Sequence, residues 1–294
     1  MALPFKLPWK IYLENLLNGD TKMHINVDYH VHPNHSIDAK RNATLDSYCL
    51  EAVKKNISQI CFTTHVDLNP YLEDQLKVIR FSSVQLPTDH ESMKRYIDNC
   101  EKVRYRYNEL KILIGLEIDY SHHYDQLIKD TVPWDMIDYS LVGVHYFKKN
   151  ESISSCNFTN DKYMEEQIIK EYYYNIEKAI ESNMFDAIAH IDLYKKSSGF
   201  QLFNLESSLL KHTFRLMNKH NVALEINTRK DSKGDWFPSK RIISMAACEG
   251  VKKFSVGSDC HSTDDLGYET SKAIAYAVSQ GMTLLDIPKT YCSI

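Results

Sequence analysis

The chain has 294 residues, 43% hydrophobic and 25% charged, which is enough apolar material for a buried core and excludes a disordered chain. A net charge of −4 and a pI of about 6.4 argue against nucleic acid as the main partner. The seven cysteines include no CxxC pair, which argues against a disulfide framework or zinc ribbon. Because no signal-peptide core or membrane-spanning apolar run occurs, we expect a soluble cytoplasmic protein.

Short apolar runs alternate with longer helix-like stretches along the chain. Seven runs rich in Ile, Val, Leu and Phe predict strands, at 24–31, 59–64, 112–118, 139–145, 185–190, 222–227 and 254–258. Helices are predicted at 45–55, 91–110, 162–182, 205–219, 239–249 and 264–279. The stretch 67–90, with two prolines, predicts a long loop or a small excursion.

This alternation predicts an α/β fold built from repeated β–α units. Both a closed or distorted barrel and an open doubly wound sheet fit the pattern. No Pro/Gly/Ser-rich linker or sequence repeat divides the chain, so we expect a single domain over residues 1–294. Its core would cover about residues 24–280, with residues 1–22 as an N-terminal extension.

Residues of the types that bind metals stand at or just after the ends of all seven predicted strands. Parallel strands in such folds gather their carboxyl ends at one face, where active sites are built. Alternation along a strand also turns both histidines of an HxH pair to the same side. We therefore expect one clustered metal site that draws on His30, His32, His65, Glu117, His145, His190, Glu225, Asp259 and His261.

Imidazole and carboxylate ligands together favour zinc, manganese or iron over calcium or magnesium. Cys260 should point away from such a site if its segment is extended. Ordinary structural roles are expected for the remaining histidines, which are His24, His35, His90, His122, His123, His212 and His220. Asp67 and Asp192, each close after a candidate ligand, are either partners that orient a histidine or ordinary capping and loop acids.

The ordered motifs resemble those of the polymerase and histidinol phosphatase superfamily, and within it the monofunctional histidinol-phosphate phosphatases. They are DYHVH at 28–32, CFTTH at 61–65, GLE at 115–117, GVH at 143–145, AHIDL at 189–193, LEINT at 224–228 and GSDCHS at 257–262. The resemblance implies a distorted (β/α)₇ TIM-like barrel with two or three divalent transition-metal ions. It also implies hydrolysis of L-histidinol phosphate, a step of histidine biosynthesis, by a metal-activated hydroxide.

The resemblance also distributes the ligands. It implies a first metal on His30, His32, Glu117 and Asp259, and a second on Glu117, His145 and His190. His65 and His261 would hold a third, joined by Asp38, which stands where the family has an acid or histidine. Asp259 and His261 are the candidate catalytic residues. Asp259 would orient or deprotonate the attacking water, and His261 would help to protonate the leaving group.

Basic residues follow the fifth and sixth strands, where the family holds the substrate phosphate. The family has an arginine after the fifth-strand histidine, whereas this chain has Lys195 and Lys196. Lys196 and Arg229 are our candidates to contact phosphate, although lysine offers a point charge and not a bidentate fork. The departure leaves open another small phosphorylated substrate or a nuclease activity. An amidohydrolase-like C–N hydrolase or a metal-binding module without turnover are further alternatives.

Overall fold

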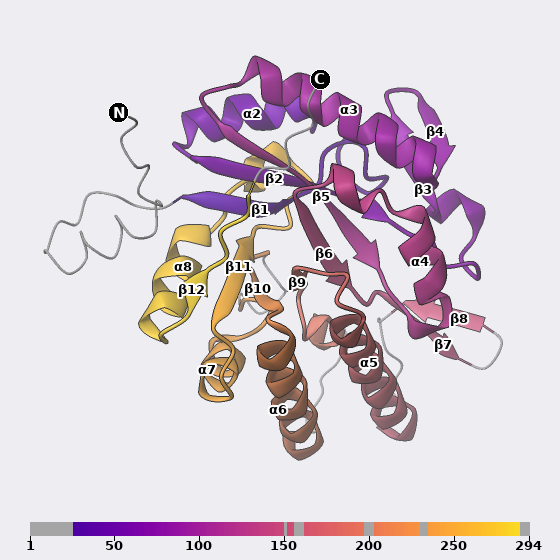
Figure 1. Ribbon diagram of the computed structural model, residues 1–294, viewed down its shortest axis with the longest axis vertical. Coiled ribbons are helices and arrows are strands. Elements are labelled where there is room, and N and C mark those ends of the chain that lie inside the picture. Colours follow the sequence, from indigo (N-terminus) through magenta and orange to yellow (C-terminus); the bar gives the residue numbers. More distant parts are fainter. Residues whose placement is uncertain (1–25, 150–151, 156–161, 197–202, 230–234, 289–294) are drawn as a thin grey trace, which may run out of the picture.

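The computed structural model describes residues 26–149, 152–155, 162–196, 203–229 and 235–288. Its centre is a parallel eight-stranded sheet with the order β1-β2-β5-β6-β9-β10-β11-β12, curled strongly into a half-barrel (Figure 1). Hydrophobic side chains fill both faces of these strands, as parallel sheets require. The strands are β1 (Val27–Val31), β2 (Gln59–Val66), β5 (Lys111–Asp119), β6 (Tyr139–Gly143), β9 (Ala187–Ile188), β10 (Ala223–Asn227), β11 (Lys253–Gly257) and β12 (Thr283–Leu284).

The curl brings the first strand of the sheet against β11, along a line that we call the seam. A parallel bridge joins Val31 to Cys260 there, and the amide of His32 donates to the carbonyl of Cys260 at 3.0 Å. The buried carboxylate of Asp28 in β1 accepts hydrogen bonds from the amide and hydroxyl of Ser258, at 2.8 and 2.5 Å. The seam therefore closes at the carboxyl ends of the strands, where the candidate site residues lie.

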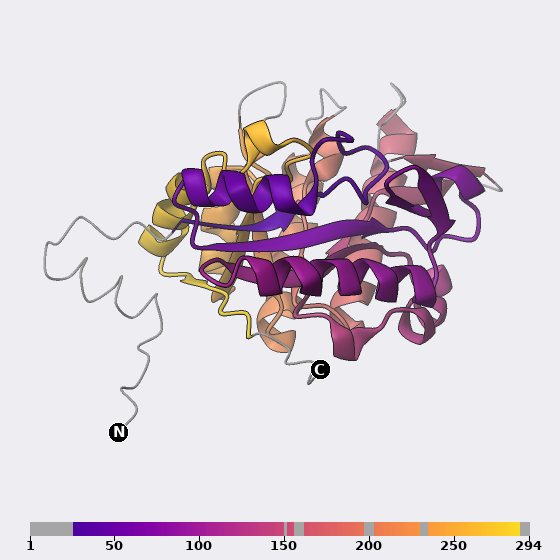
Figure 2. The ribbon, with the colours of Figure 1, turned by 90° about the horizontal axis from the view of Figure 1, so that it is seen from above.

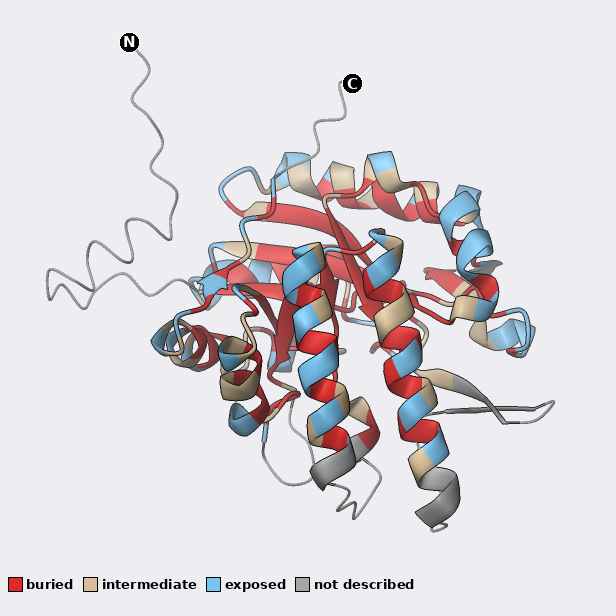
Figure 3. Ribbon diagram, turned by 60° about the horizontal axis from the view of Figure 1, so that its bottom comes forward, coloured by how far each residue is buried: buried red, intermediate tan, exposed pale blue. Residues whose placement is uncertain are grey.

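Helices surround the outside of the curled sheet (Figure 1), and their inner faces are buried whereas their outer faces are exposed (Figure 3). Apolar residues at helical spacing explain this: in α3, Met93, Tyr96, Ile97 and Cys100 are buried against the sheet. The helices are α2 (Leu45–Lys54), α3 (His90–Arg106), α4 (Asp125–Thr131), α5 (Lys162–Ser182), α6 (Phe203–His220), α7 (Lys240–Cys248) and α8 (Thr270–Ser279). In the described part of the chain, no helix has the length and apolarity needed to cross a membrane.

The predicted α/β barrel is confirmed, with differences at particular elements. The fifth predicted strand, 185–190, shortens to Ala187–Ile188, and the short strand β12 extends the sheet beyond the seven predicted strands. The predicted helix at 264–279 divides into a 3₁₀ turn at Thr263–Asp265 and α8, because Gly267 intervenes with a φ of +69°. The single-domain organisation stays a prediction.

The predicted excursion at 67–90 contains structure of its own. A 3₁₀ turn at Asp74–Leu76 leads into the antiparallel strands β3 (Val78–Phe81) and β4 (Val84–Pro87). Ser82, at the tip between them, has a φ of +53°. The hairpin lies at the edge of the molecule beside α3 (Figures 1 and 2), and in the chain it follows β2 after the 3₁₀ turn.

Candidate metal centre

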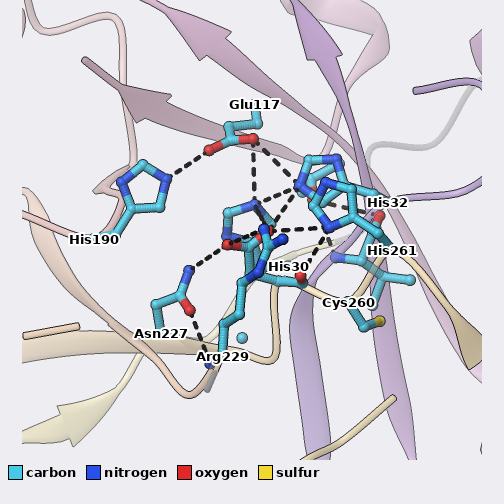
Figure 4. A network of polar contacts seen from close by, with 12 residues as sticks. His30, His32, Glu117, His190, Asn227, Arg229, Cys260 and His261 are labelled. Carbon is cyan, nitrogen blue, oxygen red and sulfur yellow. Dashed lines mark hydrogen bonds and ion pairs between the residues drawn. The ribbon is translucent and has the colours of Figure 1, made fainter. Parts of the chain in front are cut away.

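Glu117 stands at the middle of the candidate site, and its carboxylate is surrounded by imidazoles (Figure 4). The side chain is 1% exposed. Its Oε2 lies 2.9 Å from His65 Nδ1, 3.3 Å from His32 Nε2 and 3.4 Å from His30 Nε2. Its Oε1 lies 2.9 Å from His190 Nε2 and 3.3 Å from His145 Nε2. One carboxylate thus joins two groups of histidines, as a ligand that bridges two ions would.

Three groups of side chains, two of which share His32, have the spacing needed to hold a metal ion. Within each group, one potential ligand atom per residue lies within 4.8 Å of the others. Strand register explains part of this, because Glu117 in β5 is the direct neighbour of His65 in β2. The groups are His30, His32 and Asp259; Glu117, His145 and His190; and His32, His65 and His261.

Asp38 joins the third group from the loop between β1 and α2. Its Oδ2 lies 2.8 Å from His261 Nε2 and 3.4 Å from His65 Nε2. The Asp38 side chain is 51% exposed, whereas those of His65 and His261 are 22% and 13% exposed. The third group is therefore the one nearest to solvent.

The contacts within the site fit bound cations better than hydrogen bonds alone. His30 Nε2 and His32 Nε2 face each other at 2.8 Å, and both also face the carboxylates of Glu117 and Asp259. Glu117 Oε2 and His261 Nε2 are buried, and none of their close contacts has the geometry of a hydrogen bond. Converging nitrogens and buried carboxylates of this kind need charge compensation, so the donor set fits two or three divalent ions.

The pKa values of Glu117 and His32 are shifted in the direction that metal binding needs, whereas nearby carboxylates outweigh burial and raise the pKa values of His30, His65 and His145. Burial raises the pKa of Glu117, but the imidazoles of His30, His65 and His145 outweigh it and hold that pKa well below its usual range. Burial, with His261 and His65 nearby, lowers the pKa of His32 to about 4, so His32 is neutral at pH 7. Neutral imidazole and ionised carboxylate are the forms that bind metal.

Glu225 orients two of the candidate ligands from β10. Its Oε1 lies 2.5 Å from His30 Nδ1, which leaves His30 Nε2 to face the site. Its Oε2 accepts a hydrogen bond from the backbone amide of His190 at 2.8 Å. His190 has a φ of +24°, a sparsely populated conformation for a histidine, and this bond stabilises it. Among the residues singled out from the sequence, Glu225 thus has an orienting role and not a ligand's geometry.

Asp119 has the same role for His145 and was not predicted from the sequence. Its Oδ1 accepts from the amide of His145 at 2.9 Å and lies 3.3 Å from His145 Nδ1. Tyr124 donates its hydroxyl hydrogen to Asp119 Oδ2 at 2.6 Å. Asp67 lies near Asp119 and His145, and these three residues form a fourth group whose spacing could hold a metal ion. Because His145 Nε2 faces Glu117, we interpret Asp119 as the carboxylate that fixes the His145 tautomer.

Two glycines leave room for the imidazoles. A Cβ added at Gly257 would lie 2.1 Å from the Cβ of His30, and one at Gly143 would lie 2.5 Å from Cε1 of His145. Both glycines stand in motifs noted in the sequence, GSDCHS and GVH. The close approach of β11 to β1 therefore requires glycine at 257.

Arg229 is the candidate phosphate-binding residue that the structure places at the site. Its NH1 lies 3.3 Å from Asp259 Oδ2, and the side-chain amide of Asn227 donates from Nδ2 to the same oxygen at 3.2 Å. The arginine lines a cavity of about 390 Å³ together with Lys40, Asp38, Asp259, His261 and Tyr268. The side chain of Lys196 lies outside the described residues, as do Lys230 and Lys233.

The remaining described histidines lie away from the centre, as expected. His35 is buried with its ring edge-on to Phe81 and Tyr96. His122 Nδ1 contacts Asn175, and His220 Nδ1 contacts Asn183. Cys260 is buried at the seam and belongs to none of the groups found among the described residues.

Comparison with known proteins places these features in a family. The model of the PHP domain matches residues 28–229, which include all the candidate ligands except Asp259 and His261. A Bacillus subtilis (strain 168) protein named histidinol-phosphatase is 26% identical over 252 residues, 77% of this chain and 90% of that protein. A Deinococcus radiodurans protein named "Probable histidinol-phosphatase" is 24% identical over 257 residues, 84% of this chain and 90% of that protein.

The fold has a counterpart among solved structures. Histidinol phosphate phosphatase from Lactococcus lactis subsp. lactis Il1403, complexed with zinc, L-histidinol and phosphate, aligns with a TM-score of 0.70. The alignment covers 90% of this chain and 97% of that one, at 20% sequence identity. This chain belongs to the PHP domain family. Its buried histidine and carboxylate groups fit a polynuclear metal site, and the protein is a metal-dependent phosphoesterase of that family.

Proposed function

We propose that this protein is a phosphomonoesterase that converts L-histidinol phosphate and water into L-histidinol and phosphate. The observation that carries the proposal is the set of three groups of potential metal ligands, which the carboxylate of Glu117 joins. The names of the two bacterial relatives, each matched over 90% of its own length, supply the substrate. This chain differs from the family in one respect, since Lys195 and Lys196 stand where the family has an arginine.

We assign the candidate ligands to three divalent ions, zinc, manganese or iron. The assignment follows the spacing of the groups and the bridging position of Glu117. Asp38 is added to the third ion because of its 2.8 Å contact with His261. The ligands would be His30, His32, Glu117 and Asp259 for the first ion, Glu117, His145 and His190 for the second, and Asp38, His65 and His261 for the third.

Bound divalent ions would lower the pKa of water and polarise the phosphoryl group. The chain itself would then position the reactants. Arg229, in the cavity above Asp259, is placed to hold a phosphate oxygen. Asp259 is our candidate to orient or deprotonate the attacking water, and its carboxylate Oδ1 faces His30 and His32 in the site.

The geometry of His261 favours metal binding over proton donation. Its Nδ1 lies 3.0 Å from the backbone carbonyl of Asp259, so the ring hydrogen belongs on Nδ1. The lone pair then stands on Nε2, which faces Asp38. We therefore propose His261 as a ligand and leave protonation of the alkoxide to another group.

The decisive experiment is a turnover panel. Protein purified without chelator and loaded with zinc, manganese or iron is assayed on L-histidinol phosphate, other small phosphomonoesters, an aryl phosphate and single-stranded DNA, with chelator-treated protein as the control. We expect the highest kcat/KM on L-histidinol phosphate. If an aryl phosphate is hydrolysed equally well, the substrate is wrong although the phosphoesterase stands. Metal binding with no turnover on the panel would support a binding module.

A further inference from the structure

The β3–β4 hairpin holds the loop that carries Asp38. This loop, between β1 and α2, has no regular secondary structure around Asp38. The amide of Arg80 in β3 donates to the carbonyl of His35 at 2.8 Å. The His35 ring packs edge-on against Phe81 and Tyr96, with centroids 5.3 and 5.2 Å away. The first part of the loop is therefore fixed to the hairpin.

The side chain of Arg80 fixes the loop on both sides of Asp38. Its NH1 donates to the carbonyl of Ala39 at 3.1 Å, and its NH2 donates to the carbonyl of Ile37. Arg80 is 6% exposed, so water competes little for these hydrogen bonds. A planar guanidinium can bind two carbonyls at once because its donors have a fixed geometry.

Asp38 itself depends on this support. Its carboxylate faces His65 and His261, yet the side chain is half exposed. On the opposite side the loop is fixed by Lys40, whose amide donates to the carbonyl of His261 at 2.9 Å. The carboxylate is thus carried into the third group by a backbone held between Arg80 and His261.

We propose that Arg80 is a positioning residue that sets the affinity of the third metal ion by clamping the Asp38 loop. This inference rests on the proposed assignment of Asp38, His65 and His261 to that ion. It also gives a role to the hairpin, which follows β2 in the chain after a 3₁₀ turn and places Arg80 against the loop that bears Asp38. The hairpin would therefore complete the most exposed part of the centre.

The test is a metal titration of Arg80→Met, which removes the donors but keeps the apolar stem. Bound metal per chain is measured by elemental analysis at fixed free metal concentrations, and kcat/KM is measured alongside. We expect the wild type to bind three ions and Arg80→Met to bind two at the same metal concentration, with third-ion affinity roughly ten- to a hundredfold lower. Excess metal should restore the ion and the activity, Asp38→Asn should behave likewise, and Arg80→Lys should lie between.

Arg104→Met is the matched control. Arg104 is another arginine of low exposure, 12%, and contacts Asp138, which precedes β6 at the end of the strands away from the site. Its loss should lower the melting temperature and leave metal stoichiometry unchanged. Equal metal loss in both variants, or unchanged third-ion affinity in both Arg80→Met and Arg80→Lys, would overturn the proposal. A wild type that binds three ions but hydrolyses no phosphoester would contradict the proposed function alone, because the Arg80 comparison reads metal binding.

Discussion

Replacing Glu117 with Gln removes one negative charge from the middle of the site without changing its volume. In the structure the carboxylate is 1% exposed and contacts five imidazole nitrogens at 2.9–3.4 Å. Removing one partner from a buried charged arrangement costs about 3–5 kcal/mol. If that loss appears in the transition state, kcat/KM falls between about a hundredfold and several thousandfold, since 1.36 kcal/mol is tenfold. Two ions would lose a ligand together, so both should bind more weakly.

The assay measures kcat/KM on the best phosphomonoester, together with metal content and melting temperature. Asp138→Asn is the control, because Asp138 is also 1% exposed and contacts Arg104 away from the centre. It should lower the melting temperature and leave activity per folded protein within a few-fold of wild type. If Glu117→Gln keeps both its metal content and its kcat/KM within tenfold of wild type, the reasoning about a bridging carboxylate is refuted.

Four further predictions concern neighbouring features. Glu225→Gln should cost roughly ten- to a hundredfold in metal affinity, because His30 loses its orienting carboxylate, and equal affinities by calorimetry would contradict this. Arg229→Ala should lower kcat/KM roughly ten- to a hundredfold with metal content intact, since a charged hydrogen bond is worth about 1.5–3 kcal/mol. The control is Arg215→Ala, at an exposed arginine on α6, which should leave kcat/KM unchanged. Chelation should lower the free energy of unfolding by about 2.7 kcal/mol per ion present at a hundredfold its Kd. The melting temperature should fall with it, and an unchanged melting temperature would count against the metal site. Burial lowers the pKa of His145, but Glu117 and Asp119 outweigh it and raise that pKa to about 10. In metal-free protein the resulting stabilisation is full below about pH 6.5 and disappears as pH rises through about 10. Metal affinity should show the opposite trend, rising with pH as this proton is released, and a flat profile from calorimetry would contradict it.

Strand positions and ligand types were accessible from the sequence because both follow from local patterns. Apolar runs such as 112–118 locate the strands, and a histidine or carboxylate at the end of a run predicts a site at that face. Strand length was less accessible. β9 pairs only at Ala187 and Ile188, because the chain then turns through the positive φ of His190. The hairpin at 78–87 was missed as strands because it is short and ends at Pro87.

The partners of the ligands were not accessible, because they depend on which atoms face each other across strands. Glu225 was recognised at a strand end, but only the curl of the sheet brings its two oxygens to His30 and His190. Asp119 lies two residues beyond Glu117 in β5, and nothing in the local pattern distinguishes it from a surface acid. Its contact with His145 arises from the β5–β6 pairing, in which Asp119 is the register partner of Gly143.

The seam between β1 and β11 joins segments that lie far apart in the chain, since Asp28 and Ser258 are separated by 230 residues. Contacts of such long sequence separation carry a large loop-closure cost and tend to form late in folding. The proposed first ion would take ligands from both sides of this junction, His30 in β1 and His32 directly after it, and Asp259 in the segment after β11. The ion would then hold the two sides of the seam together. Its removal should speed amide hydrogen exchange in β1 and β11 more than in β2 and β5, because β2 stays paired with β5 along its whole length.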